Sequence, residues 1–431
     1  MKHITLVMLS IFTMVGCKDK VSKAQKEDLA QSGTTTVETA VGSLELVAPF
    51  SSESVSKSSD IIPWPKNQTP KAPEGFTVNR FADSLDHPRW TYLAPNGDYF
   101  VSEANTKNSA NQIRLLRDTD NDGVADKRFV FLKDLNQPFG MLILNNYFYV
   151  ANTDGLYRYP YTKDMTEMTA EGEKLVELSA SGYNNHWTRN IISNEAGDKI
   201  YISVGSASNA GDQGMEKEER RANILEVNLD GSGEIIYASG LRNPVGMDWN
   251  PVTGELWTSV NERDELGNNL VPDYLTSVKK GGWYGWPYSY FGQVKDPRWA
   301  DDPHDSLVAK AIIPDVALGS HTASLGLTFY NDSAFPQEYL NGAFIGQHGS
   351  WNREPFSGYK VVFVPFKNGK PQAPKDFLTG FIADENEGTV YGRPVCVSVA
   401  SDGALLVNDD DAGIIWRVAK QNNEQSQKAE E

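Results

Sequence analysis

The sequence predicts an all-β fold, and more narrowly a six-bladed β-propeller, on three observations. Six segments repeat one pattern, in which a lead-in marked by Pro or Gly precedes a short apolar strand, a turn of Asn, Asp or Gly, and a second strand. The 431-residue chain contains 36 Gly and 22 Pro, which suits a fold with many turns. No long helical periodicity competes with this pattern. Repeated sheets of three or four strands are typical of propellers.

The repeated unit is clearest at residues 240–257, GLRNPVGMDWNPVTGELW, where a tight lead-in, a strand, a turn and a second strand follow one another. The six lead-ins span residues 86–88, 137–140, 186–189, 243–246, 323–326 and 392–394. Residues 75–82 precede the first unit, and we expect them to complete the last sheet. Long loops are expected within residues 268–321, and long ordered loops on a rigid scaffold are usually functional.

The first 17 residues have the positive end and the apolar run of an export signal. Met14-Val15-Gly16-Cys17 resembles a bacterial lipobox, although such motifs usually carry Leu at the position of Met14. Cys17 would then be lipidated and would anchor an extracytoplasmic protein to a bacterial membrane, facing the periplasm. An ordinary signal peptide that is cut nearby is the alternative.

The rest of the chain is expected to have three parts. Residues 18–60 are polar and almost lack aromatics, which predicts a disordered tether. The propeller is expected at residues 61–420, and the charged residues 421–431 are expected to form a disordered tail.

Charge and cysteine content exclude several classes of protein. The formal net charge of −17 argues against nucleic acid or an anionic membrane surface as a partner. The only two cysteines, Cys17 and Cys396, exclude a disulfide framework, and Cys396 is expected to be a small buried apolar residue. No CxxCH motif is present, so the chain carries no signal for a c-type haem.

The lead-ins are expected to bring basic side chains together. In a propeller the innermost strand of each blade begins at one mouth of the central channel, so residues near the lead-ins converge there. These residues are Arg89, Gln137, His186, Arg189, Arg242, Asn243, His321, Ser324 and Arg393, with His348 and Arg353 from the fifth unit. Guanidinium groups bind carboxylates and phosphates in pairs of hydrogen bonds, which predicts a ligand with several such groups. The alternative is that some of these arginines form ion pairs between blades.

Six motifs together resemble the soluble PQQ-dependent sugar dehydrogenases, and most closely the sorbosone or pyranose dehydrogenase branch. They are NNHWTRN (184–190), GLRNPVGMDW (240–249), NERDELG (261–267), GGWYGWPY (281–288), QHGSWNREPFSGYKV (347–361) and YGRPV (391–395). The resemblance implies a six-bladed propeller that binds PQQ and calcium, oxidises a sugar or sugar aldehyde, and passes electrons to a separate acceptor.

The resemblance also implies roles for single residues. His186 would be the general base that removes the sugar hydroxyl proton as hydride passes to PQQ. Arg242 would stabilise negative charge at the quinone oxygen, and Asn243 would hydrogen-bond the quinone.

The PQQ carboxylates would be held by Arg353 and Arg393. Related glucose dehydrogenases carry a second arginine where this sequence has Val395, and a lysine near the position of Arg353. The carboxylate contacts are therefore expected to be redistributed, with His348 and Lys360 as candidates.

Two calcium sites are predicted. The calcium that accompanies PQQ is expected at the loop 261–264, with the backbone of Arg263 and Asp264 as ligands. Independently, residues 118–126 follow the spacing of a calcium loop, with Gly at position 6 and carboxylates at positions 1, 3, 5 and 9 from Asp118, Asp120, Asp122 and Asp126. The loop lacks Glu at position 12, and a solvated acidic hairpin tip is the alternative.

The sequence therefore predicts a PQQ-dependent sugar dehydrogenase. A non-catalytic propeller that binds a ligand is one alternative, and the presence of His186, Arg242 and Asn243 argues against it. A calcium-dependent propeller lactonase is another, and it would not explain the arginines.

Overall fold

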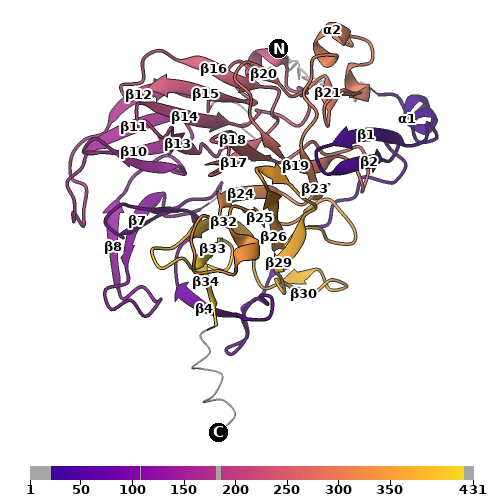
Figure 1. The fold of residues 1–431 in the computed structure, drawn as a ribbon. Helices are drawn as coiled ribbons and strands as arrows, with labels where there is room; N and C mark the ends of the chain where they lie inside the picture. Colours follow the sequence, from indigo (N-terminus) through magenta and orange to yellow (C-terminus); the bar gives the residue numbers. More distant parts are fainter. Residues whose placement is uncertain (1–20, 107, 181–185, 422–431) are drawn as a thin grey trace, which may run out of the picture.

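The computed structural model describes residues 21–106, 108–180 and 186–421 of the chain (Figure 1). Over these residues the protein is nearly all β, with two short α-helices, α1 (Lys23–Leu29) and α2 (Asp305–Val308). Short 3-10 helices lie at Met215–Lys217, Pro297–Trp299 and Gln337–Tyr339. The predicted lipobox and the tail beyond residue 421 lie outside the described residues. No helix in the described part of the chain is long and apolar enough to cross a membrane.

Six sheets make up the body of the described chain, and each contains four antiparallel strands. The four strands follow one another in sequence order in every sheet except the sixth, where the fourth strand comes from the N-terminal part of the chain. The first contains β5 (Pro88–Leu93), β6 (Tyr99–Glu103), β7 (Gln112–Arg117) and β8 (Lys127–Leu132). The second contains β9 (Met141–Leu144), β10 (Tyr147–Asn152), β11 (Gly155–Pro160) and β12 (Glu173–Glu177). The third contains β13 (Ile191–Ser193), β14 (Lys199–Val204), β15 (Asn223–Asn228) and β16 (Ile235–Ser239), and β20 (Gly282–Trp283) adds a parallel fifth strand.

The fourth sheet contains β17 (Pro244–Trp249), β18 (Leu256–Val260), β19 (Pro272–Ser277) and β23 (Val316–Ser320). The fifth contains β24 (Ser324–Phe329), β25 (Ala343–Gln347), β26 (Lys360–Val364) and β29 (Lys375–Leu378). The sixth contains β32 (Pro394–Val399), β33 (Leu405–Asp409), β34 (Ile414–Lys420) and β4 (Phe76–Ala82). Each predicted lead-in therefore lies directly before, or at the start of, the first strand of one sheet.

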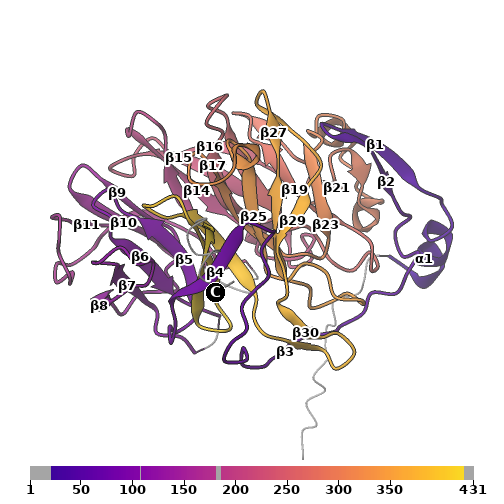
Figure 2. The same cartoon turned by 60° about the horizontal axis from the view of Figure 1, so that its bottom comes forward.

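The sixth sheet joins two segments that are far apart in sequence. β4 pairs antiparallel with β34, from Phe76 opposite Lys420 to Ala82 opposite Ile415 (Figure 2). Residues 75–82 thus complete the last sheet, as predicted.

The apolar core lies between the sheets rather than in one central mass. Within the described residues it forms six clusters, and five of them combine residues of two successive sheets. The remaining cluster lies between the first and second sheets and also includes Val245, Leu325 and Val395 from the fourth, fifth and sixth sheets. The sixth sheet packs in turn against the first, where Leu406 and Ile415 meet Val101 and Leu116. Each sheet is therefore buried on both faces, in a propeller-like arrangement.

The predicted disordered tether at residues 18–60 is wrong for residues 21–60. This segment contains α1, a hairpin of β1 (Thr35–Thr39) and β2 (Gly42–Leu46), and β3 (Asp60–Ile61). Val37 and Leu46 are buried in the cluster between the third and fourth sheets, and Ala40 N donates to Asp315 O. A few apolar side chains thus fix a segment whose overall composition is polar. Figure 1 shows the indigo hairpin beside β23 at one side of the body.

The region 268–321, where long loops were expected, is more regular than predicted. It supplies β19 and β23 of the fourth sheet, β20 of the third, and a small hairpin of β21 (Ser289–Tyr290) and β22 (Val294–Lys295). The remaining short strands are β27 (Phe366–Lys367), β28 (Lys370–Pro371), β30 (Ile382–Asp384) and β31 (Thr389–Val390).

Candidate functional site

A cavity of about 240 Å³ lies where the lead-ins of several sheets meet, and we call it the central cavity. In an antiparallel sheet the start of the first strand and the end of the second strand lie at the same edge. The lead-ins therefore meet the loops that follow β18 and β25 at this cavity. Its basic lining consists of Arg89, His186, Arg242, His321, His348 and Arg393. Other polar or aromatic lining comes from Asn243, Asn261, Asp264, Trp351 and Asn352.

The structure brings most of the residues predicted for the mouth and its ligands to this cavity, but it leaves six outside, namely Gln137, Arg189, Arg263, Ser324, Arg353 and Lys360. His186, Arg242, Asn243, His348, Arg393 and Asp264 line it. Arg353 instead donates to Asn268 O at 2.9 Å, and Lys360 Nζ lies 2.6 Å from Asp376 Oδ1. The buried side chain of Arg263 pairs with Asp296, with 2.6 Å between Nη1 and Oδ2.

His186 is held in one orientation at the wall of the central cavity. Its Nδ1 lies 2.9 Å from Ser206 O, which can only accept, so Nδ1 carries the hydrogen and Nε2 is the acceptor nitrogen. Arg221 donates to His186 O at 2.8 Å and fixes the backbone. Burial and the positive charges of Arg242 and Arg221 lower the pKa of His186 well below its usual value. The imidazole is therefore neutral near pH 7.

Arg242 is buried, with 1% of its side chain exposed, and every guanidinium nitrogen has a partner. Nε donates to Asn209 O at 3.0 Å, Nη1 donates to Glu262 O at 2.5 Å, and Nη2 lies 3.3 Å from Asp264 Oδ2. These contacts come from two loops, so the charge of Arg242 stands at a fixed place in the lining.

Asp264 links Arg242 to His321. Its second oxygen, Oδ1, lies 3.2 Å from His321 Nδ1 and accepts from Asn352 Nδ2 at 2.8 Å. Burial alone would raise the pKa of Asp264, but the hydrogen bond from His321 and the charge of Arg242 outweigh it and lower the pKa to about 2.

His321 faces an acceptor on each side of its ring, because Nε2 also lies 2.9 Å from Gly267 O. Burial lowers its pKa, but the hydrogen bond and charge of Asp264 outweigh burial, and the net pKa of His321 is raised. The geometry therefore favours the doubly protonated ring.

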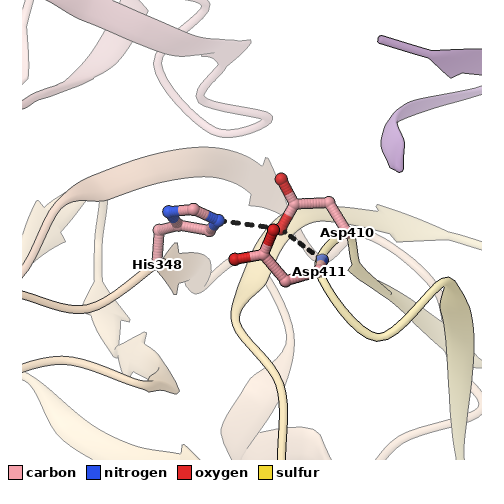
Figure 3. A group of neighbouring side chains, drawn as sticks. All are labelled: His348, Asp410 and Asp411. Atoms are coloured by element: carbon pink, nitrogen blue, oxygen red, sulfur yellow. Dashed lines mark hydrogen bonds and ion pairs between the residues drawn. The ribbon is translucent and has the colours of Figure 1, made fainter. Parts of the chain in front are cut away.

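His348, Asp410 and Asp411 form a second cluster of polar side chains (Figure 3). His348 Nε2 lies 2.7 Å from Asp410 Oδ1, which also accepts from the Asp411 backbone N at 3.0 Å. Arg89 donates to the other oxygen of Asp410, and Arg393 Nη1 lies 3.6 Å from Asp411 Oδ2.

The ligand atoms of His348, Asp410 and Asp411 are close enough to one another to hold a metal ion. Arg89 and Arg393 already neutralise the same two carboxylates, so a further cation would meet like charge there. Burial raises the pKa of Asp410, but the charges of His348 and Arg89 outweigh burial and lower it well below the usual range. The group therefore orients Arg89, His348 and Arg393 toward the central cavity.

The net charge of the lining is positive, since three arginines face a single carboxylate, that of Asp264. Two buried polar atoms at this wall, Arg89 Nε and Asn243 Oδ1, have no hydrogen-bond partner within the described residues. Buried polar atoms are normally paired, so both point to a ligand with donors, acceptors and negative charge.

The model of a family described as TrAA12-like matches residues 70–288 and 294–422, which is most of the chain. The chain belongs to the TrAA12-like family.

Relatives of this TrAA12-like chain include an uncharacterized protein of Borreliella burgdorferi, 29% identical over 365 residues that make up 81% of this chain and 90% of the relative. The pyrroloquinoline quinone-dependent pyranose dehydrogenase of Coprinopsis cinerea is 24% identical, with 83% of this chain and 55% of that enzyme covered. The chain thus spans about half the length of that relative.

Solved structures share the fold of this TrAA12-like chain. The calcium structure of Trichoderma reesei carbohydrate-active enzymes family AA12 superposes with a TM-score of 0.69 at 20% identity, covering 82% of this chain and 97% of that one. The holo form of the pyranose dehydrogenase PQQ domain from Coprinopsis cinerea superposes with a TM-score of 0.68 at 22% identity, covering 83% and 98%.

Two residues that hold lining side chains of this TrAA12-like chain in place, Asp410 and Asp411, were missed from sequence. They belong to the run Asn408-Asp409-Asp410-Asp411, which resembles a solvated turn, and their position directly after β33 was the signal that could have found them. Arg189, in contrast, was placed in the convergent set, but its buried guanidinium donates to the backbone carbonyls of His186, Thr188 and Ser179.

The predicted acidic loop lies at the hairpin tip between β7 and β8. Carboxylate oxygens of Asp118, Asp120 and Asp122 come within 4.8 Å of one another. Asp126 lies outside this group, and its Oδ1 accepts from Thr119 N at 2.9 Å. Calcium binding at this tip stays a prediction that involves three carboxylates rather than four.

Proposed function

We propose that this TrAA12-like protein is a six-bladed β-propeller that oxidises a sugar or sugar aldehyde with PQQ and calcium. The observation that carries the proposal is the convergence of His186, Arg242 and Asn243, from two different sheets, on one basic cavity. The blade count is supported by the six sheets of the body and by the apolar clusters that lie between successive sheets. The Coprinopsis cinerea relative named for PQQ and pyranose oxidation supports the reaction class.

The lining fits a polycarboxylate cofactor. Arg89 and Arg393 would hold carboxylates of PQQ, because both lie in the cavity lining and Arg89 Nε is a buried donor without a partner among the described residues. Asn243, whose Oδ1 is likewise buried and unpaired, would hydrogen-bond the cofactor. When bound, PQQ supplies a quinone that accepts a hydride.

Calcium would bind oxygen atoms of the loop 261–264. The carbonyls of Asn261 and Glu262 each accept one hydrogen bond from Arg242, and each keeps a second lone pair. The Asp264 carboxylate is the nearest acidic group of the lining. Hard oxygen donors of these kinds suit calcium, which polarises carbonyl groups as a Lewis acid.

His186 is assigned as the general base that accepts the hydroxyl proton of the sugar. Its ring is neutral, and Nδ1 is fixed on Ser206 O, so Nε2 accepts the hydroxyl proton of the sugar. Arg242 stands beside it as a fixed positive charge that stabilises negative charge developing in the cavity. The low pKa of His186 keeps it deprotonated and ready before substrate binds.

Localisation and electron transfer belong to the same proposal. Residues 14–17 support a lipid anchor at Cys17 on an extracytoplasmic membrane face. The absence of a CxxCH motif supports a separate electron acceptor rather than a c-type haem on the same chain.

One experiment tests the function. The purified chain is reconstituted with PQQ and calcium, PQQ binding is followed by absorbance, and dye reduction is measured with a panel of sugars. We expect saturable PQQ binding and sugar-dependent reduction that His186→Ala lowers by roughly 10²–10⁴-fold. His304→Ala, in the N-cap of α2, is the matched control and keeps activity. Absence of PQQ binding, or full activity of His186→Ala, contradicts the proposal.

A further inference from the structure

The N-terminal residues 48–62, which we call the strap, run along the rim of the central cavity. Phe50 N donates to Leu266 O at 2.8 Å, and Lys57 N donates to Trp351 O at 2.8 Å. Farther along, Asp60 N and Ile62 N donate to Gly388 O and Val390 O. The strap lies before residue 70, where the match to the TrAA12-like family begins.

Side chains of the strap add to these backbone contacts. Ser52 Oγ accepts from Asn268 N at 2.8 Å, and Ser54 Oγ accepts from Gly267 N at 3.1 Å. Lys57 Nζ lies 3.0 Å from Glu354 Oε1. The strap is therefore a fixed wall beside the loop that carries Asp264.

Two further hollows lie between the strap and the body, and they continue from the central cavity. A middle hollow of about 220 Å³ shares His321, Trp351 and Asn352 with the central cavity. An outer hollow of about 730 Å³ shares Ser54 and Glu265 with the middle one. The three hollows thus adjoin one another in a row from the central cavity along the strap, and we call this row the groove.

The size of the central cavity indicates that a substrate extends beyond it. At about 240 Å³ it lies below the roughly 300–1,000 Å³ usual for ligand pockets, and the proposed cofactor would occupy much of it. The substrate must then use the middle hollow, which is the adjoining space with shared walls.

Trp351 marks the boundary between the central cavity and the middle hollow. It is 52% exposed, and it is the one aromatic residue among the exposed large hydrophobic residues of the described chain. An exposed indole beside a polar pocket is a surface on which the C–H face of a sugar ring can pack. The backbone bond from Lys57 N fixes this residue from the strap side.

The charges of the outer hollow indicate a neutral occupant. Its charged lining carries both signs, and it consists of Lys26, Glu53, Asp212, Arg263, Glu265 and Arg298. A strongly charged ligand would meet both signs, whereas the hydroxyl groups of a sugar can donate to carboxylates and accept from cations.

We propose that the groove under the strap binds the non-reacting units of a neutral oligosaccharide whose terminal unit is oxidised in the central cavity. This inference rests on the proposed function, with PQQ taking up the two electrons and His186 the proton. Trp351 stacks on the second sugar unit, and the strap with Glu53 contacts the third.

The test compares monosaccharides with trisaccharides on the reconstituted protein. Glucose, mannose and xylose are compared with cellotriose, mannotriose and xylotriose. We expect kcat/KM of at least one trisaccharide to exceed that of its monosaccharide by about tenfold. Trp351→Ala should lower this ratio about tenfold, and Glu53→Ala about threefold. Val252→Ala, at an equally exposed residue in the turn between β17 and β18, should leave the ratio unchanged.

A second readout does not depend on the cofactor. The same trisaccharide should change the tryptophan fluorescence of the protein without PQQ, and Trp351→Phe should abolish this change. If sugars are oxidised but the ratio is unaffected in Trp351→Ala and Glu53→Ala, the inference is overturned and the proposed function stands. If no sugar is oxidised and the trisaccharides leave the fluorescence unchanged, both are overturned.

Discussion

Arg242 and Asp264 form an ion pair at the wall of the central cavity, with 3.3 Å between Nη2 and Oδ2. The same carboxylate meets His321 and Asn352 on its other oxygen. One partly buried acid thus joins residues at the fourth sheet to residues at the fifth sheet, and the fixed charge that the proposed chemistry needs depends on that junction.

Asp264→Asn should lower kcat more than it raises KM. The amide keeps the shape but removes the charge that balances Arg242 and His321, so Arg242 is less firmly placed. The loss of charge-assisted hydrogen bonds should also cost about 2–3 kcal/mol of unfolding free energy. Steady-state kinetics and urea unfolding measure both effects. Unchanged kcat in a folded variant would show that Arg242 does not need this partner.

Arg221→Gln should move the acid limb of the kcat/KM profile to higher pH. Burial first, and then the charges of Arg242 and Arg221, lower the pKa of His186, so removing one positive charge raises it. Arg221 does not line the central cavity, so its loss reaches the chemistry only through His186. We expect a shift of roughly half to one pH unit. Arg221→Lys keeps the charge and should keep the profile.

Asp410→Asn should weaken PQQ binding by about tenfold. Asp410 holds both Arg89 and His348, so the variant releases two lining side chains at once. Absorbance titration with PQQ gives the dissociation constant. Asp411→Asn is the comparison, because Asp411 contacts only the more distant Arg393 Nη1, and it should have a smaller effect.

Calcium should raise the Tm of the protein because it binds the acidic hairpin tip between β7 and β8. Asp120→Asn removes one of the three grouped carboxylates and should abolish the part of the shift that is independent of PQQ. Asp126→Asn should keep the shift, because the Asp126 carboxyl bonds Thr119 instead. If EDTA leaves the Tm of the unmutated protein unaltered, the result would favour the alternative, a solvated acidic hairpin tip that binds no calcium.

Cys17→Ser should move the protein from the membrane fraction to the soluble fraction of a bacterial host that processes lipoproteins. Metabolic labelling with a fatty acid checks the modification directly, and Cys396→Ser serves as the control because Cys396 is buried. Labelling that survives Cys17→Ser would refute the lipobox.

The repeat pattern predicted the body of the fold because it reflects local chemistry. The lead-in at Pro244 and the turn at Asn250 lie where β17 begins and ends, and each needs only neighbouring residues to form. The ordered segment at residues 21–60 was missed for the opposite reason. Its order depends on Val37 and Leu46 burying against distant sheets, and composition alone carries no record of such contacts.

The candidate site was predicted best at the lead-ins, which the repeat pattern places at one edge of the sheets. His186 and Arg242 stand at the lead-ins of the third and fourth sheets, and both line the central cavity. Arg353 and Lys360 lie within or after a long loop, where the side chain's direction depends on partners such as Asn268 and Asp376. Sequence position could not show those partners.

The pairing of β4 with β34 has a consequence for synthesis on the ribosome. β4 is made early, and its partner strand follows roughly 340 residues later. At about 5–20 residues per second, β4 waits roughly 20–70 s with its pairing edge open. During that interval Phe76 to Ala82 form an unpaired apolar strand edge, the kind of segment that holding chaperones bind. The last sheet closes only after β34 has been made.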